Sequence, residues 1–111
     1  MSDLQCPARM WVLPATATDL DRFEGLRSAK VSLVYSDARS LARAVEMGDD
    51  LGVPVEIRLD LPRLGAADPV PEVLDDLADL HRGEAVALVL DVATALVLDR
   101  DSDGWSVQVL D

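Results

Sequence analysis

Aspartates with nearby arginines are the residues whose types and spacing come closest to a chemical site in this sequence. Ser36 and Asp37 follow one strand-like apolar segment, and Asp91 follows another. Because the carboxyl ends of parallel strands meet at one edge of a sheet, these side chains should lie near one another. Arg39 and Arg43 fall on the helix-like segment that begins there and would add positive charge. A carboxylate-based site is one hypothesis; the favoured alternative is a helix cap and a strand-end turn.

A second set of carboxylates matches half of a calcium-binding loop. Asp99, Asp101 and Asp103 alternate with other residues ahead of Gly104, a spacing that directs oxygens onto one ion. The twelfth position of such a loop should be a bidentate glutamate, but here it is Leu110, and strand-like segments flank the loop instead of helices. We therefore expect a solvated hairpin turn and no metal, with weak calcium binding by these three aspartates as the alternative.

The single histidine and the single cysteine do not indicate catalysis. His81 has no obvious nucleophile or orienting acid beside it, and at the end of an expected helix it would be exposed and favoured by the helix dipole. Cys6 alone can form neither an intrachain disulfide nor a thiolate metal cluster. Because the sequence also lacks a glycine-rich phosphate loop, a nucleophile elbow and a pair of metal-ligand histidines, we expect no cofactor.

Charge and composition narrow the classes of partner. The 111 residues include 21 acidic and 10 basic side chains, which gives a formal net charge of −11 at pH 7. A field of that sign repels phosphate backbones and anionic lipid headgroups, so we expect neither nucleic acid nor a membrane as partner. Half of the residues are hydrophobic, which suffices for one packed core and excludes intrinsic disorder. No stretch is apolar over the length of a signal peptide or a membrane span, and we expect a cytoplasmic location.

Alternating strand-like and helix-like segments must position these residues. Apolar runs rich in β-branched side chains predict strands over residues 9–13, 29–35, 53–59 and 84–90. Helix-start residues, apolar periodicity and glycine stops predict three helices. These are a short one carrying Leu20, Phe23 and Leu26, one from Ser36 or Asp37 to Gly52, and one from Pro71 to Gly83. Proline and glycine predict a loop over residues 62–69.

The buried faces of the two longer helices follow from the spacing of their apolar residues. On the first of them, the expected buried residues are Leu41, Ala44, Val45, Gly48 and Leu51. On the second, they are Val70, Val73, Leu74, Leu77 and Leu80.

The order of these segments predicts the fold class. Two strand-like segments around an Asp-Gly turn, 95–98 and 105–110, indicate an antiparallel hairpin. The nearly continuous apolar run at 84–90 is typical of a parallel strand that is covered on both faces. We therefore predict an α/β three-layer sandwich on a mostly parallel sheet with a C-terminal antiparallel hairpin. In this prediction residues 1–8 form a flexible N-terminus and residues 9–111 a single domain.

Four passages carry a resemblance to a known family. They are Trp11-Val12-Leu13-Pro14-Ala15-Thr16, Tyr35-Ser36-Asp37-Ala38-Arg39-Ser40-Leu41-Ala42, Leu51-Gly52-Val53-Pro54-Val55, and Arg82-Gly83-Glu84 with the strand that runs to Asp91. In order and wording these passages, with the closing hairpin, resemble the histidine phosphatase (phosphoglycerate mutase-like) superfamily, above all the small bacterial phosphohistidine phosphatases. The likeness has gaps, because the first helix is short and the helices that normally precede the hairpin are missing.

The resemblance implies that the chemistry of this family is lost. In the family the first strand ends in Arg-His-Gly with a nucleophilic histidine, and here Leu13 and Pro14 stand in place of the arginine and the histidine. Leu41 stands at the second arginine and Asp91 at the second histidine. Phosphoryl transfer through histidine needs an imidazole nitrogen and cations around the phosphoryl oxygens. These four degenerate pocket positions supply neither, so the resemblance implies no catalytic residue.

We therefore expect a catalytically inactive histidine phosphatase-like domain that serves as a protein-binding or regulatory module. One form of that binding is self-association as a homodimer. On this hypothesis Leu13, Pro14 and Leu41 are packed, and no cleft lies above the strand ends. A ligand binder or enzyme that uses Asp37 and Asp91 is the alternative and requires a deep polar cleft. A weak calcium-binding module is a further alternative.

Overall fold

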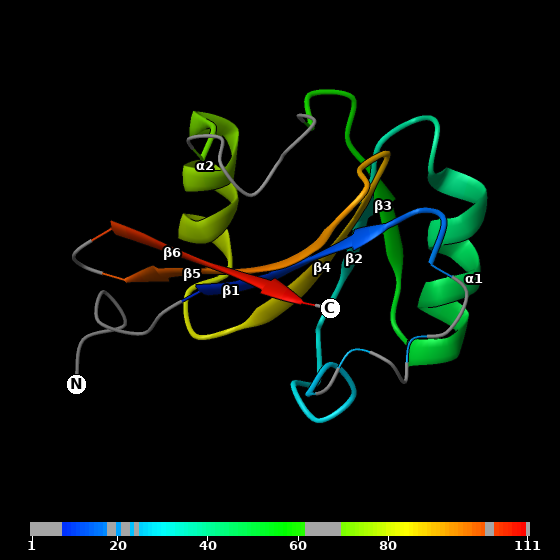
Figure 1. The fold of residues 1–111 in the computed structure, drawn as a ribbon, viewed down its shortest axis with the longest axis horizontal. Helices are drawn as coiled ribbons and strands as arrows, with labels where there is room; N and C mark the ends of the chain where they lie inside the picture. Colours follow the sequence, from blue (N-terminus) through cyan, green and yellow to red (C-terminus); the bar gives the residue numbers. More distant parts are fainter. Residues whose placement is uncertain are drawn as a thin grey trace.

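The chain folds around a six-stranded sheet that carries one helix on each face (Figure 1). The computed structural model describes residues 8–17, 20, 23, 25–61, 70–101 and 104–110. The elements are β1 (Ala8–Pro14), β2 (Val34–Ser36), α1 (Leu41–Leu51), β3 (Val55–Ile57), α2 (Glu72–Leu80), β4 (Ala85–Leu90), β5 (Ala95–Asp101) and β6 (Gly104–Leu110). The predicted loop at 62–69 lies outside the described residues. So does the predicted flexible N-terminus, apart from Ala8, which already belongs to β1.

The strand order is β3-β2-β4-β1-β5-β6. Strand β4 pairs in parallel with both β1 and β2, and β2 pairs in parallel with β3. Strand β5 runs antiparallel to β1 and then turns back into β6 as a hairpin. This mixed sheet confirms the predicted α/β class with its C-terminal antiparallel hairpin. In the part of the chain that the structure describes, neither helix is long and apolar enough to cross a membrane.

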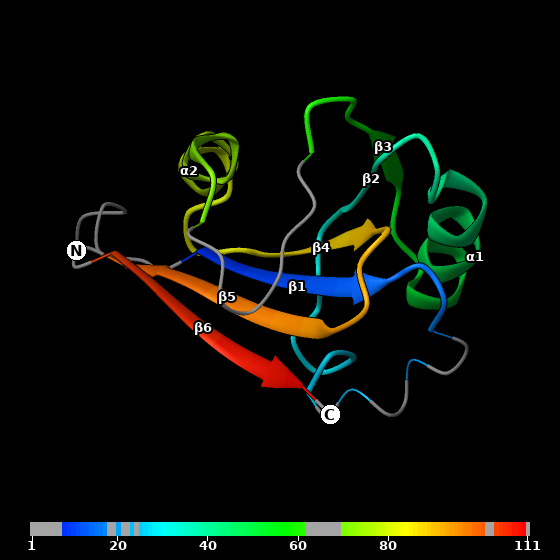
Figure 2. The ribbon, with the colours of Figure 1, turned by 45° about the horizontal axis from the view of Figure 1, so that its top comes forward.

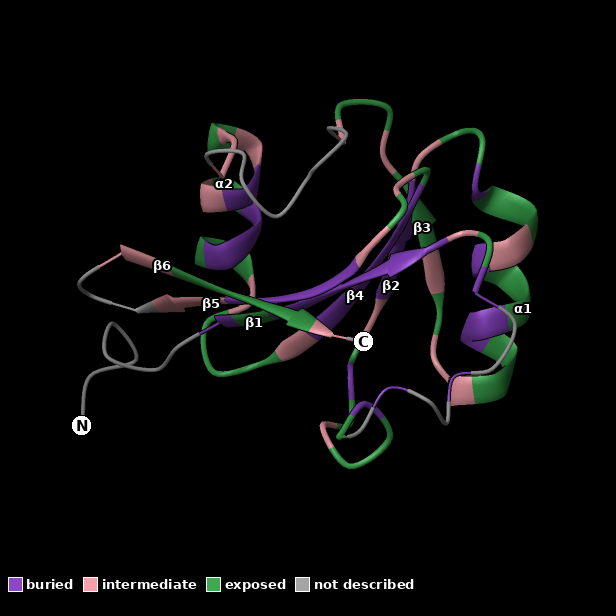
Figure 3. Cartoon of the chain, in the orientation of Figure 1, coloured by how far each residue is buried: buried purple, intermediate pink, exposed green. Residues whose placement is uncertain are grey.

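Alternate side chains of β1 and β4 enter two separate cores. Trp11 and Leu13 point into a core that α1 covers through Ala44 and Met47. Met10 and Val12 point into the opposite core, which α2 covers. Figure 2 shows the two helices on opposite sides of the sheet, and Figure 3 shows its central strands buried over most of their length. This burial on both faces explains why the two strands are almost continuously apolar and show no alternation of apolar and polar residues.

The segment between β1 and β2 corrects one prediction, because its described residues form no α-helix. Leu20, Phe23 and Leu26 are all buried, but their N–H groups bond three residues back: Phe23 to Leu20 and Leu26 to Phe23. Gly25 adopts a φ of 88°, which no α-helix contains. The spacing of three residues that indicated a helix is the repeat of tight turns instead.

Two strands are shorter than predicted. A strand was predicted over residues 29–35, but β2 spans only Val34–Ser36. Ala29 and Lys30 lie in turns, and Lys30 has a φ of 54°. The prediction at 53–59 yields Val55–Ile57, and Leu59 beyond it is 82% exposed. Both lie toward the β3 edge of the sheet, where fewer neighbours are available to extend the pairing.

The buried faces of the helices differ from prediction in a few positions. On α1, Ala44, Met47 and Gly48 are buried, whereas Leu41 and Val45 are 37% and 45% exposed. The helix lies against β2 and the narrow edge strand β3, so only a thin stripe of its surface is covered. The helix ends as predicted at Gly52, whose φ of 72° suits a residue without a side chain.

On α2 the buried residues are Leu74, Leu77 and Ala78, and Leu80 is 68% exposed. The prediction for Leu80 was wrong because His81, four residues after Leu77, takes the next position on the covered side. Only 13% of the His81 side chain is exposed.

Gly48 packs closely against Val53 and Val55 and generates the first testable prediction. An added Cβ would overlap Cγ2 of Val55 and would lie 3.0 Å from the carbonyl oxygen of Val53. We expect Gly48→Ala to lower the free energy of unfolding by about 1–3 kcal/mol through overpacking, although alanine favours helices. Urea denaturation measures this change.

A matched control for this variant is Asp49→Ala, at the exposed neighbouring position, which should leave stability unchanged or slightly raised. In a Gly48→Ala background, Val55→Ala should cost less than it does alone, because it removes the overlapping methyl group. Additive effects of the two changes would contradict the proposed contact.

Candidate functional site

The structure brings the predicted carboxylates together at one edge of the sheet. Pro14 pairs with Leu90 and Ser36 with Val89, so β1, β2 and β4 end side by side. The backbone N–H of Asp91 donates to Oδ2 of Asp37 at 3.3 Å. The turns after β2 and β4 are therefore joined directly.

Asp37 serves the backbone at this edge. Its Oδ1 accepts the N–H of Ser40 at 2.8 Å, and its Oδ2 accepts the N–H of Asp91. Ser40 is the residue before α1 and makes no capping bond with its own side chain, so Asp37 stabilises the entry to the helix. Ser36 is fully buried, and its hydroxyl donates to the carbonyl oxygen of Asp37 at 2.7 Å. The arrangement fits the helix cap and strand-end turn that the sequence favoured.

The two predicted arginines lie in different surroundings. Nη1 of Arg39 is 3.6 Å from Oδ2 of Asp91, in a pair whose side chains are 75% and 52% exposed. Nε of Arg43 donates to the carbonyl oxygen of Ala17 at 2.8 Å, and its Nη1 pairs with Glu46 at 2.7 Å. Arg43 therefore ties α1 to the segment after β1, and only Arg39 contacts an acidic residue of the edge.

Of the four positions that the sequence analysis matched to a phosphatase pocket, two are apolar and packed. Leu13 is fully buried and Pro14 is buried as well. Leu41 is the exception: it was expected to be packed, but it is 37% exposed, because α1 presents a neighbouring stripe to the sheet. No imidazole lies at this edge among the described residues, because His81 is in the turn before β4, at the other end of that strand.

A hollow beside Pro14 has room for only a small group. Its volume is about 100 Å³, below the 300–1,000 Å³ typical of ligand pockets. Among the residues that the structure describes, its lining is uncharged and consists of Pro14, Thr16, Ala17, Phe23, Ala93, Thr94, Ala95 and Leu110. This is not the deep polar cleft, holding both aspartates and an arginine, that a carboxylate-based enzyme requires.

A larger hollow lies on the face of the sheet that carries α1. It has a volume of about 360 Å³ and includes Arg9, Trp11, Ser28 and Gln108 in its lining, but none of the predicted site residues. The indole N–H of Trp11 is buried without a hydrogen-bond partner in the described structure. This hollow is therefore separate from the strand-end carboxylates.

The predicted calcium ligands are described only in part. Both carboxylate oxygens of Asp99 accept hydrogen bonds from Arg9, at 2.7 and 3.2 Å. This bond raises the pKa of the Arg9 guanidinium. Asp103 and the side chain of Asp101 lie outside the described residues, and the rest of the described chain holds no cluster of three metal-ligating side chains. The binding of calcium by this loop stays an alternative.

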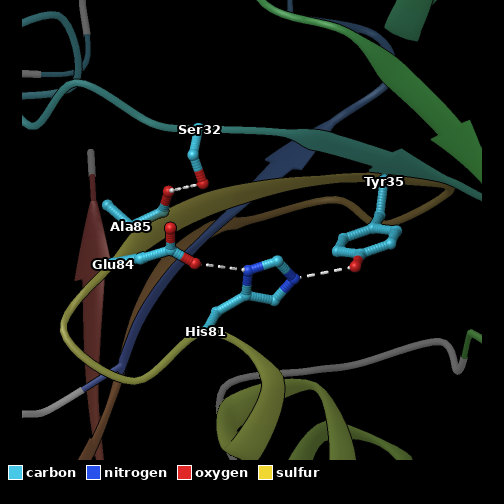
Figure 4. A network of polar contacts seen from close by, with 5 residues as sticks. All are labelled: Ser32, Tyr35, His81, Glu84 and Ala85. Carbon is cyan, nitrogen blue, oxygen red and sulfur yellow. Dashed lines mark hydrogen bonds and ion pairs between the residues drawn. The ribbon is translucent and has the colours of Figure 1, made fainter. Parts of the chain in front are cut away.

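A polar cluster that the sequence analysis missed joins α2 to β2. Nδ1 of His81 lies 2.9 Å from Oε1 of Glu84, and Nε2 lies 2.8 Å from the hydroxyl of Tyr35 (Figure 4). Because a carboxylate only accepts hydrogen bonds, Nδ1 carries the proton of the bond to Glu84. Nε2 and the Tyr35 hydroxyl form the second bond of the cluster. The prediction that His81 would be exposed was therefore wrong. A lone tyrosine on an apolar strand was the available signal, since a buried hydroxyl needs a partner.

The cluster has the order carboxylate, imidazole, hydroxyl that is found in catalytic relays. Only 4% of Tyr35 is exposed, and the residue belongs to the core beneath α2. Tyr35 is therefore almost fully shielded from solvent in the described structure. The cluster acts as a structural link between the end of α2 and strand β2.

Tyr35 generates a prediction on pH dependence. Burial raises the pKa of its hydroxyl most strongly, and the negative charges of Glu56 and Glu84 raise it further. Since the folded state favours the neutral phenol, stability is full below the unfolded pKa of about 10 and falls as the pH rises through the folded pKa.

The chain contains one tyrosine, so phenolate absorbance reports on this group alone. We expect its titration midpoint to lie above that of the urea-unfolded chain, and Glu56→Gln to lower it. Tyr35→Phe should remove the signal. Equal midpoints in the folded and unfolded states would contradict the assignment.

Asp37 generates a prediction on stability. Asp37→Ala removes the acceptor of two backbone N–H groups, and we expect it to cost about 1 kcal/mol in urea denaturation. Arg39→Ala, which removes only an exposed ion pair, should change stability by less than about 0.5 kcal/mol. If the two variants were equally stable, the capping role of Asp37 would be wrong.

Comparison with known proteins leaves the family open. No protein-family model matches this sequence, and no curated protein matches it either. The resemblance to histidine phosphatases therefore rests on the passages quoted above and stays a prediction.

Proposed function

We propose that this chain is a catalytically inactive binding module, built as a shortened histidine phosphatase-like domain, that recognises protein partners including a second copy of itself. The proposal has two parts, the absence of phosphoryl-transfer chemistry and the presence of surfaces suited to association.

The first part depends on which residues lie at the edge of the sheet where β1, β2 and β4 end. Leu13 and Pro14 are buried, and Asp37 is occupied by backbone N–H groups. Asp91 adds a second carboxylate there, and Nη1 of Arg39 lies 3.6 Å from its Oδ2. Carboxylates repel the oxygens of a phosphoryl group, and proline and leucine supply no nucleophile. The edge is thus unsuited to accept or hold a phosphoryl group.

Exposed apolar side chains support the second part. In the described part of the chain, seven large hydrophobic residues are at least 37% exposed: Leu41, Val45, Ile57, Leu59, Leu80, Val107 and Val109. They belong to α1, α2, β6 and the region around β3. On a chain with a net charge of −11, such surfaces favour association with other proteins over binding of anions.

The first part predicts that the pure protein releases no phosphate. Incubation with an aryl phosphate and with a phosphohistidine peptide should give no release above a blank without protein, and no stable phosphoprotein by mass spectrometry. Asp91→Asn and Asp37→Asn serve as matched variants. Release by the wild-type chain that either variant abolishes would overturn the proposal, because it would show chemistry at this edge.

A further inference from the structure

Strand β6 forms one outer edge of the sheet. It pairs with β5 along its whole length, from Ala95 opposite Leu110 to Asp101 opposite Gly104. In the described part of the chain no strand pairs with its other side, as Figures 1 and 2 show. Every second residue of such a strand directs its backbone N–H and C=O groups outward, so β6 presents unpaired groups to a further strand.

The sequence of β6 lacks the features that normally protect an edge. Edge strands are commonly short, charged, interrupted by proline or bulged, which prevents pairing with another chain. Strand β6 has seven residues, Gly-Trp-Ser-Val-Gln-Val-Leu, without charge or proline, and its register with β5 contains no bulge. The opposite edge, β3, has only three residues and includes Glu56. In a chain with 31 charged residues, a long neutral edge is unusual.

The charge of the chain limits where a second copy could contact it. Two copies that each carry a net charge of −11 repel one another, so contact is cheapest where no acidic group must be buried. Near β6, Asp99 is neutralised by Arg9, and Asp75 is contacted by Arg100 at 3.4 Å. Asp75 also accepts the indole N–H of Trp105 at 2.8 Å. These two described aspartates beside the strand are therefore paired with cations, whereas Asp103 and Asp111 flank its ends in the sequence.

We propose that β6 pairs antiparallel with β6 of a second copy, so that two sheets join into one across a two-fold axis. This inference rests on the self-association included in the proposed function and names its surface. A two-fold axis makes the same strand both donor and acceptor of the contact, as symmetric dimers require.

One register makes the strand complementary to itself. With the axis at Val107, this residue lies opposite its own copy and Trp105 lies opposite Val109. These three side chains alternate onto one face, the face of the α2 core to which Trp105 belongs. Ser106 then lies opposite Gln108 on the other face. Val107 and Val109 are 41% and 44% exposed in the single chain, and this pairing would cover both.

The experiment compares Val107→Glu with Val45→Glu. The two valines are similarly exposed, at 41% and 45%, but Val45 lies on α1, so the variants differ only in where the same charge is placed. Sedimentation equilibrium over a concentration series gives the dimer dissociation constant. We expect a wild-type dimer of about twice 12.0 kDa. Val107→Glu should weaken it roughly fivefold or more through opposed like charges, and Val45→Glu should not.

A mixture of variants tests the register. Val107→Glu and Val107→Lys should each dimerise poorly alone, and an equal mixture should recover a heterodimer, because opposite charges then face each other across the axis. Amide hydrogen exchange of the wild-type protein supplies a measurement without any variant. The β6 amides should become better protected as the protein concentration rises.

Three outcomes would overturn the inference. They are a wild-type chain that stays monomeric at every concentration, equal dimerisation of the two glutamate variants, and a mixture that recovers nothing. The second would leave self-association intact and exclude β6 as its surface. None of them affects the assignment as a catalytically inactive domain, which depends on phosphate release alone.

Discussion

The burial of β1 and β4 on both faces is the constraint on which the rest of the structure depends. The two strands pair in parallel from Arg9 opposite Ala85 to Pro14 opposite Leu90. Apart from Arg9 and Ala85 their residues are buried, so their backbone polar groups must be satisfied within the sheet. Their apolar side chains need a cover on each face, which α1 and the turns after β1 provide on one side and α2 on the other. The hairpin then extends the sheet beyond β1.

This constraint also decides the chemistry available at the strand ends. Leu13 belongs to the core, and the turns after β2 and β4 are joined through the carboxylate of Asp37. Its two oxygens accept backbone N–H groups, so their role is to close the turns around the end of the sheet. The hollow beside Pro14 is small, and the described residues that line it carry no charge. The same residues that could suggest a catalytic site thus stabilise the edge of a sheet.

Sequence reasoning succeeded where a pattern reported directly on burial or on local backbone geometry. Such patterns predicted strand β4 from its apolar run, the end of α1 at Gly52, and the hairpin that β5 and β6 form. It failed where several structures share one spacing: Leu20, Phe23 and Leu26 fit a helix and a set of tight turns equally well. The choice between them depended on Gly25 and on the core that these side chains had to reach.

The sequence by itself determined the α/β class, the meeting of Asp37 and Asp91 at one sheet edge, and a net charge that disfavours anionic partners. Each follows from local periodicity, strand direction or composition. Only the tertiary structure decided which side chains touch. It placed His81 between Tyr35 and Glu84, and it left β6 as a neutral outer strand. Such contacts join residues far apart in the chain, and their existence depends on how helices and strands pack, which no local pattern encodes.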